Sequence, residues 1–359
     1  MTENNSQRTS KRRKTFKRLT ATLLALLMVV TVMAVGFPVT ANAEQTAVTY
    51  AVYSWDDETK TLSHTNKTVT DYTAVTEAYL KANKYTLEGG PSAEESKVFV
   101  VTKSITLLNR LKIKKKTFVD LVIPKGVQLT PRQGISCSYG KTSSGFAAVR
   151  ILGAGRIEAS SSYECAAIGG DSGEVNGLLE FHGPEVQSIA YTGGAGIGGG
   201  KSKRDADETT YIKFFAGKII AYGHDGEAGI SGGDNQIGAK TYVYGGDVYG
   251  GGANGGAAFG GGKDEGTRGI WIYGGSVRAV GGVDAAGIGT GEDANMNGTI
   301  YIGGEKTRLN AWGGQRGAGI GAGDGDTSFF TSEGDMKGTI TIDCGNKSDI
   351  VAYGGYRAC

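Results

Sequence analysis

The stretch "GGQRGAGIGAGDGD" occupies residues 313–326, and half of its fourteen residues are glycine. Such a segment is a flexible linker, a phosphate-binding loop or one turn of a repeat. Its pattern of two small residues, one large apolar residue and glycine occurs five more times upstream. The large residues of the six copies, 29 to 33 positions apart, are Ile168, Ile197, Ile230, Phe259, Ile288 and Ile320. Regular spacing of this length indicates an array of structural repeats.

Two further segments with period-two alternation accompany each copy. Examples are "IWIYGG" (270–275) and "SVRAVGG" (276–282), and both end in glycine. Three short strands in about thirty residues, joined by tight corners, are typical of one coil of a parallel β-helix. A coil cannot bury its inner face alone, so the core forms only when coils stack. The sequence therefore predicts an all-β, right-handed parallel β-helix with three short strands per coil.

The array defines the expected domain organisation. Residues 96–359 are predicted to form the solenoid, with glycine-poor opening coils over 96–146 and glycine-rich repeats over 147–359. The last repeat stops in mid-coil. Residues 44–95 are weakly patterned and are expected to form a small cap or a linker. Cys137 and Cys165 lie about one coil apart, so the sequence allows either a disulfide between them or buried free thiols.

The first 43 residues resemble an export signal. A basic segment, "KRRKTFKR" (11–18), precedes an apolar run (19–37) and the small-residue motif Ala41-Asn42-Ala43. This order predicts a signal peptide cleaved after Ala43 and a secreted or cell-surface protein. The alternative is an uncleaved leader that anchors the protein in the membrane. The leader holds seven basic residues and one acidic residue, so without it the net charge falls from +2 to −4. The remaining chain gives no reason to expect a nucleic-acid partner.

The segment order "VFVVTKSITL", "RLKI", "VDLVIPKGVQLT" and then tandem "GAGIGGG" and "TIYIGG" units resembles a known group. The chain is similar over 96–359 to glycine-rich, pectate-lyase-like β-helix repeat proteins exported by Gram-positive bacteria. The resemblance implies a β-helix, export, and a role as an adhesin or glycan-binding protein. It supplies no catalytic residues.

Alternation places aromatic side chains on the outer face of the solenoid. Ile270 and Ile272 are expected to point inward, so Trp271 and Tyr273 point outward. Corresponding positions of neighbouring coils complete two aromatic columns. The candidate glycan-binding residues are Tyr242, Trp271, Tyr301, Phe215, Tyr244 and Tyr273. Stacked aromatic side chains can instead simply stabilise a sheet. The third strands add the outward residues Tyr191, Tyr222, Trp312 and Tyr353.

Two insertions, 201–210 and 324–337, lie between the glycine strand and the aromatic strand of their coils. Insertions confined to one side of a solenoid often mark its binding face. They therefore support an outward aromatic platform for a polysaccharide or a host-surface glycan.

Other chemistry has weaker support. Acidic residues such as Asp171 and Asp324 follow the glycine strands, where they serve as solvated corners; calcium is the alternative ligand, but the calcium-binding nonapeptide repeat is absent. No metal site or cofactor is expected otherwise. His224, Asp225 and Glu227 form the one candidate group for hydrolysis. We therefore expect a glycan-binding adhesin rather than an enzyme, with a polysaccharide lyase or hydrolase, and a purely structural spacer, as alternatives.

Overall fold

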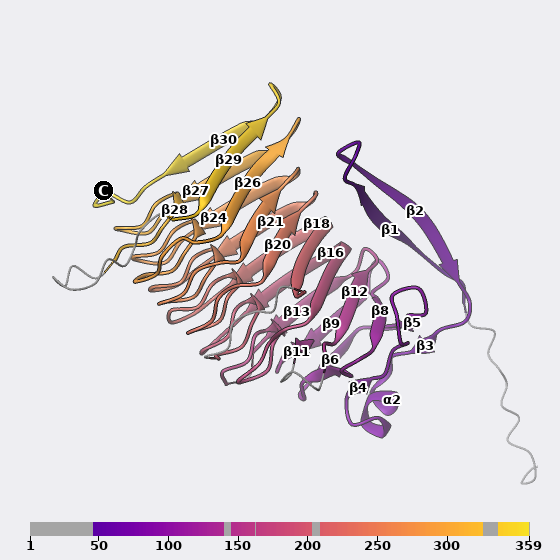
Figure 1. Ribbon diagram of the computed structural model, residues 1–359. Coiled ribbons are helices and arrows are strands. Elements are labelled where there is room, and N and C mark those ends of the chain that lie inside the picture. The colour runs from indigo at the N-terminus through magenta and orange to yellow at the C-terminus, as the bar shows by residue number, and fades with distance from the viewer. Residues whose placement is uncertain (1–45, 140–144, 162, 203–208, 326–336, 359) are drawn as a thin grey trace, which may run out of the picture. The chain divides into compact units, whose positions relative to one another are not determined.

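The computed structural model describes residues 46–139, 145–161, 163–202, 209–325 and 337–358. In these ranges the protein is all-β with almost no helix, and parallel strands stack as a solenoid whose coils are roughly 30 residues apart (Figure 1). This confirms the predicted parallel β-helix class. The leader and its cleavage site lie outside the described residues. None of the helices in the described part of the chain has the length and apolar character of a membrane span.

One coil near the C-terminal end shows how the repeat folds. Each of its three strands pairs in parallel with the equivalent strand of the next coil. The strands of this coil are β23 (Gly269–Ile272), β24 (Ser276–Val280) and β25 (Ile288–Gly289), and their partners are β26 (Thr299–Gly304), β27 (Arg308–Trp312) and β28 (Ile320–Gly321). Every coil is therefore held to its neighbours by backbone hydrogen bonds on three sides.

The glycine strands form a nine-stranded parallel sheet among the described residues. Its other members are β4 (Thr86–Leu87), β7 (Leu111–Ile113), β10 (Ile135–Ser136), β14 (Ile168–Gly169), β17 (Ile197–Gly198), β19 (Ile230–Ser231) and β22 (Phe259–Gly260). The second strands, which carry the aromatic columns, include β3 (Thr73–Ala74), β5 (Lys97–Val100), β8 (Phe118–Val122), β12 (Ala148–Leu152), β20 (Lys240–Val243) and β29 (Thr339–Cys344). The third strands include β6 (Ile105–Leu107), β9 (Gln128–Pro131), β13 (Arg156–Ser160), β21 (Asp247–Gly251) and β30 (Asp349–Tyr353).

Two coils depart from the expected three short strands. In β16 (Leu178–Ile189) and β18 (Tyr211–Tyr222), the second and third strands run on as one twelve-residue strand. The register between them shifts on either side of His182, which marks the bend where the other coils have a turn. Tight corners are thus replaced by bulges in these coils, and the aromatic strand continues into the third face without a break.

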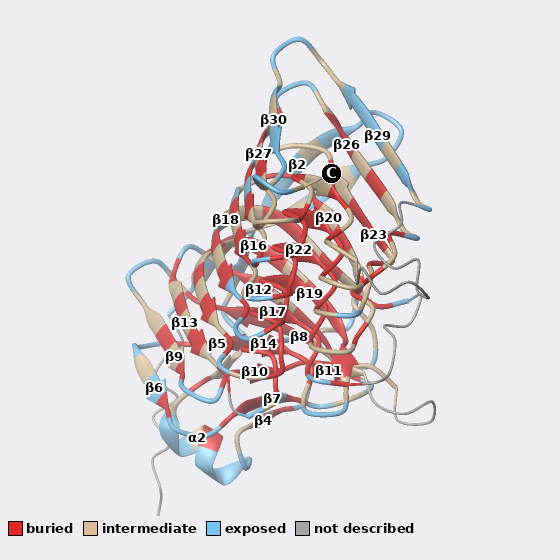
Figure 2. Ribbon diagram, turned by 90° about the vertical axis from the view of Figure 1, so that its left-hand side faces the viewer, coloured by how far each residue is buried: buried red, intermediate tan, exposed pale blue. Residues whose placement is uncertain are grey.

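The predicted inner ladder is confirmed. The six large residues of the glycine repeat are consecutive partners in the parallel sheet, and all except the terminal Ile320 are fully buried. The ladder continues upstream through Ile135 and Leu111. Figure 2 shows the buried residues running through the stacked strands, with more exposed residues in the final strands β29 and β30. Burial of a continuous ladder along the axis supplies the hydrophobic stabilisation that a single coil lacks.

In four of the six coils of the glycine repeat, the residue after the ladder position is glycine for a steric reason. Gly260 has a φ of 139°, and a Cβ atom there would lie 1.8 Å from the carbonyl oxygen of Gly289 in the next coil. In one coil Ser231 occupies the position with a φ of 106°, and its hydroxyl donates a hydrogen bond to the carbonyl of Ala239. The "Ile-Gly" pairs of the sequence thus reflect backbone approach between coils rather than flexibility.

The range 44–95 contains a hairpin, a short helix and the first strands of the solenoid. Strands β3 and β4 pair with β5 and β7 of the next coil. Helix α2 (Glu77–Ala82) lies between them, with the Thr76 hydroxyl accepting a hydrogen bond from the Tyr79 amide at its N-terminus. Leu80 of this helix is fully buried with Val75 and Leu87 in the main core. The helix therefore covers apolar residues at the N-terminal end of the stack.

Cys137 and Cys165 are both free and buried. Their 28-residue spacing does not make them axial neighbours, because Ile135 pairs with Ile168 and this coil is 33 residues long. Cys137 instead donates from its thiol to the carbonyls of Ala147 and Leu178, 3.3 and 3.5 Å away. The adjacent strands β11 (Ser138–Tyr139) and β15 (Val175–Asn176) pair antiparallel at this corner. Of the two possibilities the sequence allowed, the structure has the free thiols.

Candidate functional site

The first predicted aromatic column forms in register. Tyr242, Trp271 and Tyr301 are successive partners on β20, β23 and β26. All three alternate with fully buried residues, and their own side chains are half-buried, so they lie on the outer face as alternation predicts. Repeat alignment therefore placed these side chains in their correct order along the solenoid.

The first two rings of this column stack on each other. Tyr242 and Trp271 stack with their centroids 4.8 Å apart and their planes 13° apart. The indole leans over Gly269, where a Cβ atom would come within 2.3 Å of it, and Tyr301 leans the other way over Gly303. Within the described residues Tyr242 is the one ring neighbour of Trp271. The indole face turned toward β26 therefore has no aromatic partner.

Below the aromatic residues the same column carries alternating charge. Its members Asp120, Arg150, Glu180 and Lys213 pair in register on successive coils. Arg150 binds both carboxylate oxygens of Asp120, at 2.6 and 3.0 Å. Lys213 lies 3.8 Å from Glu180, and its ammonium lies 6.0 Å from the ring centre of Tyr242. This cation–π contact joins the charged part of the column to the aromatic part.

A small cavity lies beside this charged ladder. Its volume is about 50 Å³, and its lining includes Asp120, Arg150, Glu180 and Tyr211. Ligand pockets for small molecules usually measure ~300 Å³ or more. The cavity is therefore too small for a sugar, and the charged ladder is best explained as a set of cross-strand pairs that tie coils together.

The second predicted column forms but is covered. His182, Phe215, Tyr244 and Tyr273 stack one upon the next, with centroid separations of 4.5, 5.0 and 5.5 Å. Phe215 is only 6% exposed and Tyr244 only 9%. The expectation that these two rings face solvent is wrong, because a hairpin from the N-terminal region lies over them.

This covering hairpin consists of β1 (Val48–Asp56) and β2 (Thr61–Val69), paired antiparallel over their full length (Figure 1). The carboxylate of Asp56 accepts hydrogen bonds from the amides of Glu58 and Thr59, and Lys60 has a φ of 53°. A side-chain-capped turn followed by a left-handed residue is a common way to close such a loop. The turn thus fixes the register that brings Trp55 and Tyr53 to one side.

The hairpin contacts the second column through Trp55 and Tyr53, and a separate apolar cluster through Tyr50. Trp55 lies 4.9 Å from Tyr244 and 5.0 Å from Tyr273, measured between ring centroids. The Tyr53 amide donates to Nδ1 of His182 at 3.1 Å. Tyr50 is buried in a separate apolar cluster with residues of β5, β8 and β12. The covering segment is therefore anchored by both aromatic and apolar contacts.

The Tyr53 contact also assigns the state of His182. Because Nδ1 accepts a hydrogen bond, the proton resides on Nε2, which lies 3.3 Å from the carboxylate of Glu180. Burial raises the pKa of Glu180, but its interactions with His182, Lys213 and Tyr211 outweigh this and hold the pKa below its usual value. His182, which the sequence did not single out, thus links the hairpin to the charged ladder.

The third face carries aromatic residues that are exposed within the described part of the chain. Tyr222, Trp312 and Tyr353 belong to one column of register partners, and Trp312 and Tyr353 stack with centroids 6.3 Å apart. Tyr222 is 38% exposed, Tyr353 is 55% exposed, and Tyr191 is 54% exposed. These side chains are more accessible than the second column.

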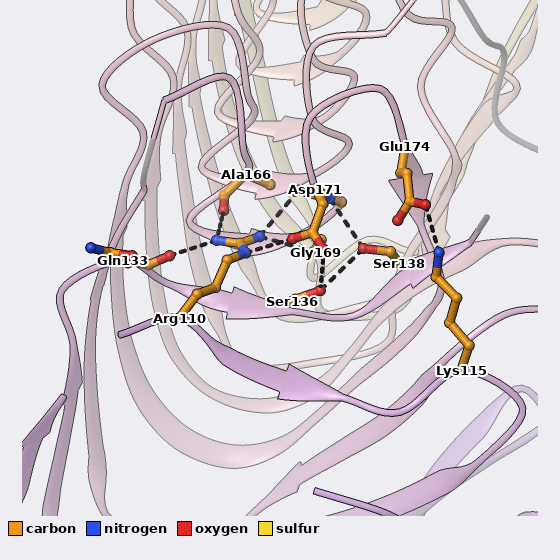
Figure 3. A network of polar contacts seen from close by, with 10 residues as sticks. Arg110, Lys115, Gln133, Ser136, Ser138, Ala166, Gly169, Asp171 and Glu174 are labelled. Atoms are coloured by element: carbon orange, nitrogen blue, oxygen red, sulfur yellow. Dashed lines mark hydrogen bonds and ion pairs between the residues drawn. The ribbon is translucent and has the colours of Figure 1, made fainter. Parts of the chain in front are cut away.

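Three of the acidic corner residues form ion pairs. Asp171 accepts from Arg110 at 2.6 Å and from the hydroxyl of Ser136 at 2.8 Å, as Figure 3 shows. Asp234 pairs with Lys201, and Asp324 pairs with Arg316. Across the described ranges, no three acidic, histidine or cysteine side chains gather as a metal site would require. Most of the insertions 201–210 and 324–337 lies outside the described residues.

The residues considered for hydrolysis do not form a carboxylate pair. Glu227 is 1% exposed, and its two oxygens accept the backbone amides of Gly193 and His224. Asp225 instead accepts a hydrogen bond from the Asn254 amide, at 2.9 Å. The buried carboxyl of Glu227 thus organises a corner, and the arrangement offers no pair of facing carboxylates for glycoside cleavage.

Comparison with protein-family models, with curated proteins and with solved structures finds no match to this chain. The function must therefore be argued from the surfaces themselves. Among the described residues, three features are on the outer side of the solenoid: an aromatic column with one indole face that has no ring partner, a second column beneath the hairpin, and a third face with exposed rings.

Proposed function

We propose that the protein is an exported, surface-located β-solenoid that binds a polysaccharide or a host-surface glycan, as an adhesin does. The binding surface is the column Tyr242–Trp271–Tyr301. The observation that carries the proposal is the indole of Trp271, which stacks on Tyr242 with one face and has no ring against the other. Aromatic faces bind planar or apolar faces of ligand rings, at about 1–3 kcal/mol per ring for nucleic-acid bases.

The geometry of the solenoid suits a polymeric ligand. Equivalent residues of adjacent coils repeat at about 4.8 Å, comparable to the length of one sugar unit. A glycan that lies along the axis would meet successive outward side chains of β23, β26 and β29 at intervals close to its own repeat. Solenoids commonly present such extended binding surfaces.

The first test is a glycan array followed by titration of the strongest ligand. We expect Trp271→Ala to weaken binding about tenfold or more, because one stacking contact is lost. The melting temperature should change little, since the indole is on the outer face. Tyr163→Ala is the control, because it removes an exposed aromatic ring that belongs to neither proposed glycan-binding face. Unchanged affinity of Trp271→Ala, or absence of any glycan ligand, would refute this function.

The leader supports the export part of the proposal. A basic segment, an apolar run and Ala41-Asn42-Ala43 have the order of a secretory signal. N-terminal sequencing of the native protein should therefore find Glu44 as the first residue of extracellular material. A leader retained on membrane-bound protein would instead show that the segment serves as an anchor.

A further inference from the structure

The outward residues of β21, β24, β27 and β30 make up a face that combines stacked rings with unpaired positive charge. We call it the Arg278 face. Arg278 is exposed at its centre, and its register partners are Tyr249 on one side and Asn310 on the other. Trp312 and Tyr353 lie in the neighbouring column of the same strands. The hairpin covers the second strands, so this face is separate from the covered column.

Arg278 is held between two aromatic rings. Its guanidinium carbon lies 5.7 Å from the ring centre of Tyr249 and 5.2 Å from that of Trp312. Both distances lie within the range of a cation–π contact, and a guanidinium carries its five N–H donors in a planar fork. No carboxylate of the described residues forms an ion pair with Arg278. The charge is therefore oriented but not neutralised, as a site for a bidentate anionic group requires.

A basic groove opens beside Arg278 on the same side. Its volume is about 380 Å³, and it is lined by Gly275, Ser276, Lys306, Arg308 and Lys347. The three cationic residues are exposed, and none of them has an ion-pair partner among the described residues. Asp349, the register partner of Arg308, is the closest carboxylate in the sheet order, yet no ion pair joins them. By contrast, Arg156 and Arg316 each pair with two carboxylates.

The groove and the stacked arginine lie at distances that one oligosaccharide can span. Ser276 lines the groove and precedes Arg278 by two residues on the same side of β24, about 7 Å along the strand. Arg308 precedes Trp312 by four residues on β27, about 13 Å along the strand. A chain lying across these strands would thus meet cations at one end and aromatic rings at the other.

From this arrangement we propose that the Arg278 face binds an anionic polysaccharide, with its carboxylate or sulfate groups on Lys306, Arg308, Lys347 and Arg278 and a sugar ring against Trp312. The mature chain has a net charge of −4, so long-range electrostatics does not draw polyanions to the whole protein. Binding must therefore come from the local cluster. The proposal is independent of the Trp271 surface, because the two faces share no residue.

The test is a calorimetric titration of the full protein with four polymers at low salt. They are a heparin fragment with sulfate groups, hyaluronan with carboxylates, neutral dextran and duplex DNA. We expect one or both anionic glycans to bind and dextran to fail. The triple variant Lys306→Gln, Arg308→Gln, Lys347→Gln should weaken that binding by about tenfold or more, since each lost cation removes a screened ionic contact. Arg278→Lys should weaken it too, because the planar donors are lost while the charge is kept.

The matched control is Lys103→Gln, Lys112→Gln, Lys125→Gln. These lysines are also exposed and without an ion pair among the described residues, but they lie in the opening coils. The control makes the same change in net charge and should alter affinity by less than about threefold. Equal weakening by both triple variants would overturn the proposal, because only net charge would then matter. Absence of anionic-glycan binding, or equally tight binding of DNA, would also overturn it.

Discussion

The indole of Trp55 stacks on the ring of Tyr244, with centroids 4.9 Å apart and planes at 29°. One partner belongs to the N-terminal hairpin and the other to a coil in the middle of the solenoid. An aromatic ring of the hairpin thus packs against the second aromatic column of the same chain. The outer side of the second column therefore accepts a flat ring, and the proposal for Trp271 is that a sugar makes the same kind of contact on the first column.

Removal of this ring should release the hairpin. In Trp55→Ala, the two ring contacts with Tyr244 and Tyr273 are lost, and each aromatic pair contributes about 0.5–1.5 kcal/mol beyond area burial. We expect amide hydrogen exchange within 48–69 to accelerate about tenfold or more, while β20 and β23 keep their protection. Lys67→Ala, an exposed change on β2, should leave exchange as it is. Unchanged hydrogen exchange in Trp55→Ala would mean that the contacts of Tyr53 and Tyr50 are enough to hold the hairpin on the solenoid.

Glu227 should make stability depend on pH. Burial raises its pKa from 4.5 to about 7, against the opposing effect of the Gly193 and His224 amide hydrogen bonds. A carboxyl with a higher pKa in the folded protein favours folding in its protonated form. Below pH 4.5 the protonated carboxyl adds roughly 3 kcal/mol to the free energy of unfolding. This stabilisation is lost as the pH rises through about 7.

The measurement is urea unfolding from pH 4 to pH 8. In Glu227→Gln, the part of the stability decrease that comes from this carboxyl should disappear, because the amide does not ionise. Glu95→Gln, at an exposed position, should retain the wild-type slope. A Glu227→Gln protein with the same slope as wild type would show that another group causes the pH dependence.

Two glycine substitutions should distinguish the steric cost of close contact between coils from the conformational cost of a positive φ. Gly260→Ala would place Cβ 1.8 Å from the Gly289 carbonyl, at a φ of 139°. Gly173→Ala also has a positive φ, 76°, but nothing lies within 4 Å of its Cβ. We expect a loss of about 1 kcal/mol at Gly173 from conformation alone. Gly260→Ala should lose several times more or fail to fold, as measured by thermal unfolding. Equal losses would mean that neighbouring coils can separate to admit a methyl group.

The solenoid could be predicted from sequence because its determinants repeat. Ile230, Phe259 and Ile288 occupy identical environments, so their spacing alone gives the coil and its inner side. Trp55 and Tyr53 occur once, and their partners lie far along the chain, so no periodicity connects them. The apolar alternation of Val48, Tyr50 and Val52 was the one local signal that this segment packs against something.

The candidate site was predicted less completely, because contacts that occur once and join distant parts of the chain leave no periodic signal. Alternation assigned Tyr242 and Tyr244 to the outer side correctly, but it cannot tell an exposed ring from one covered by a distant segment. The spacing of Cys137 and Cys165 failed because coils vary in length: 33 residues separate the ladder positions in that coil, whereas 29 separate those around Phe259. Register depends on these local insertions, which the average repeat length conceals.

The constant 29-residue step from Ile230 to Phe259 and from Phe259 to Ile288 has a genetic consequence. A duplication or an in-frame deletion of one such unit leaves every remaining coil beside a partner with the same inner ladder and the same "Ile-Gly" geometry. Each coil touches mainly its two neighbours, so apart from the hairpin contacts at Tyr244 and Tyr273 the loss is confined to one interface. Unequal recombination between the coding repeats would therefore yield folded variants of different length. The number of repeats is thus a heritable property that can change in one event.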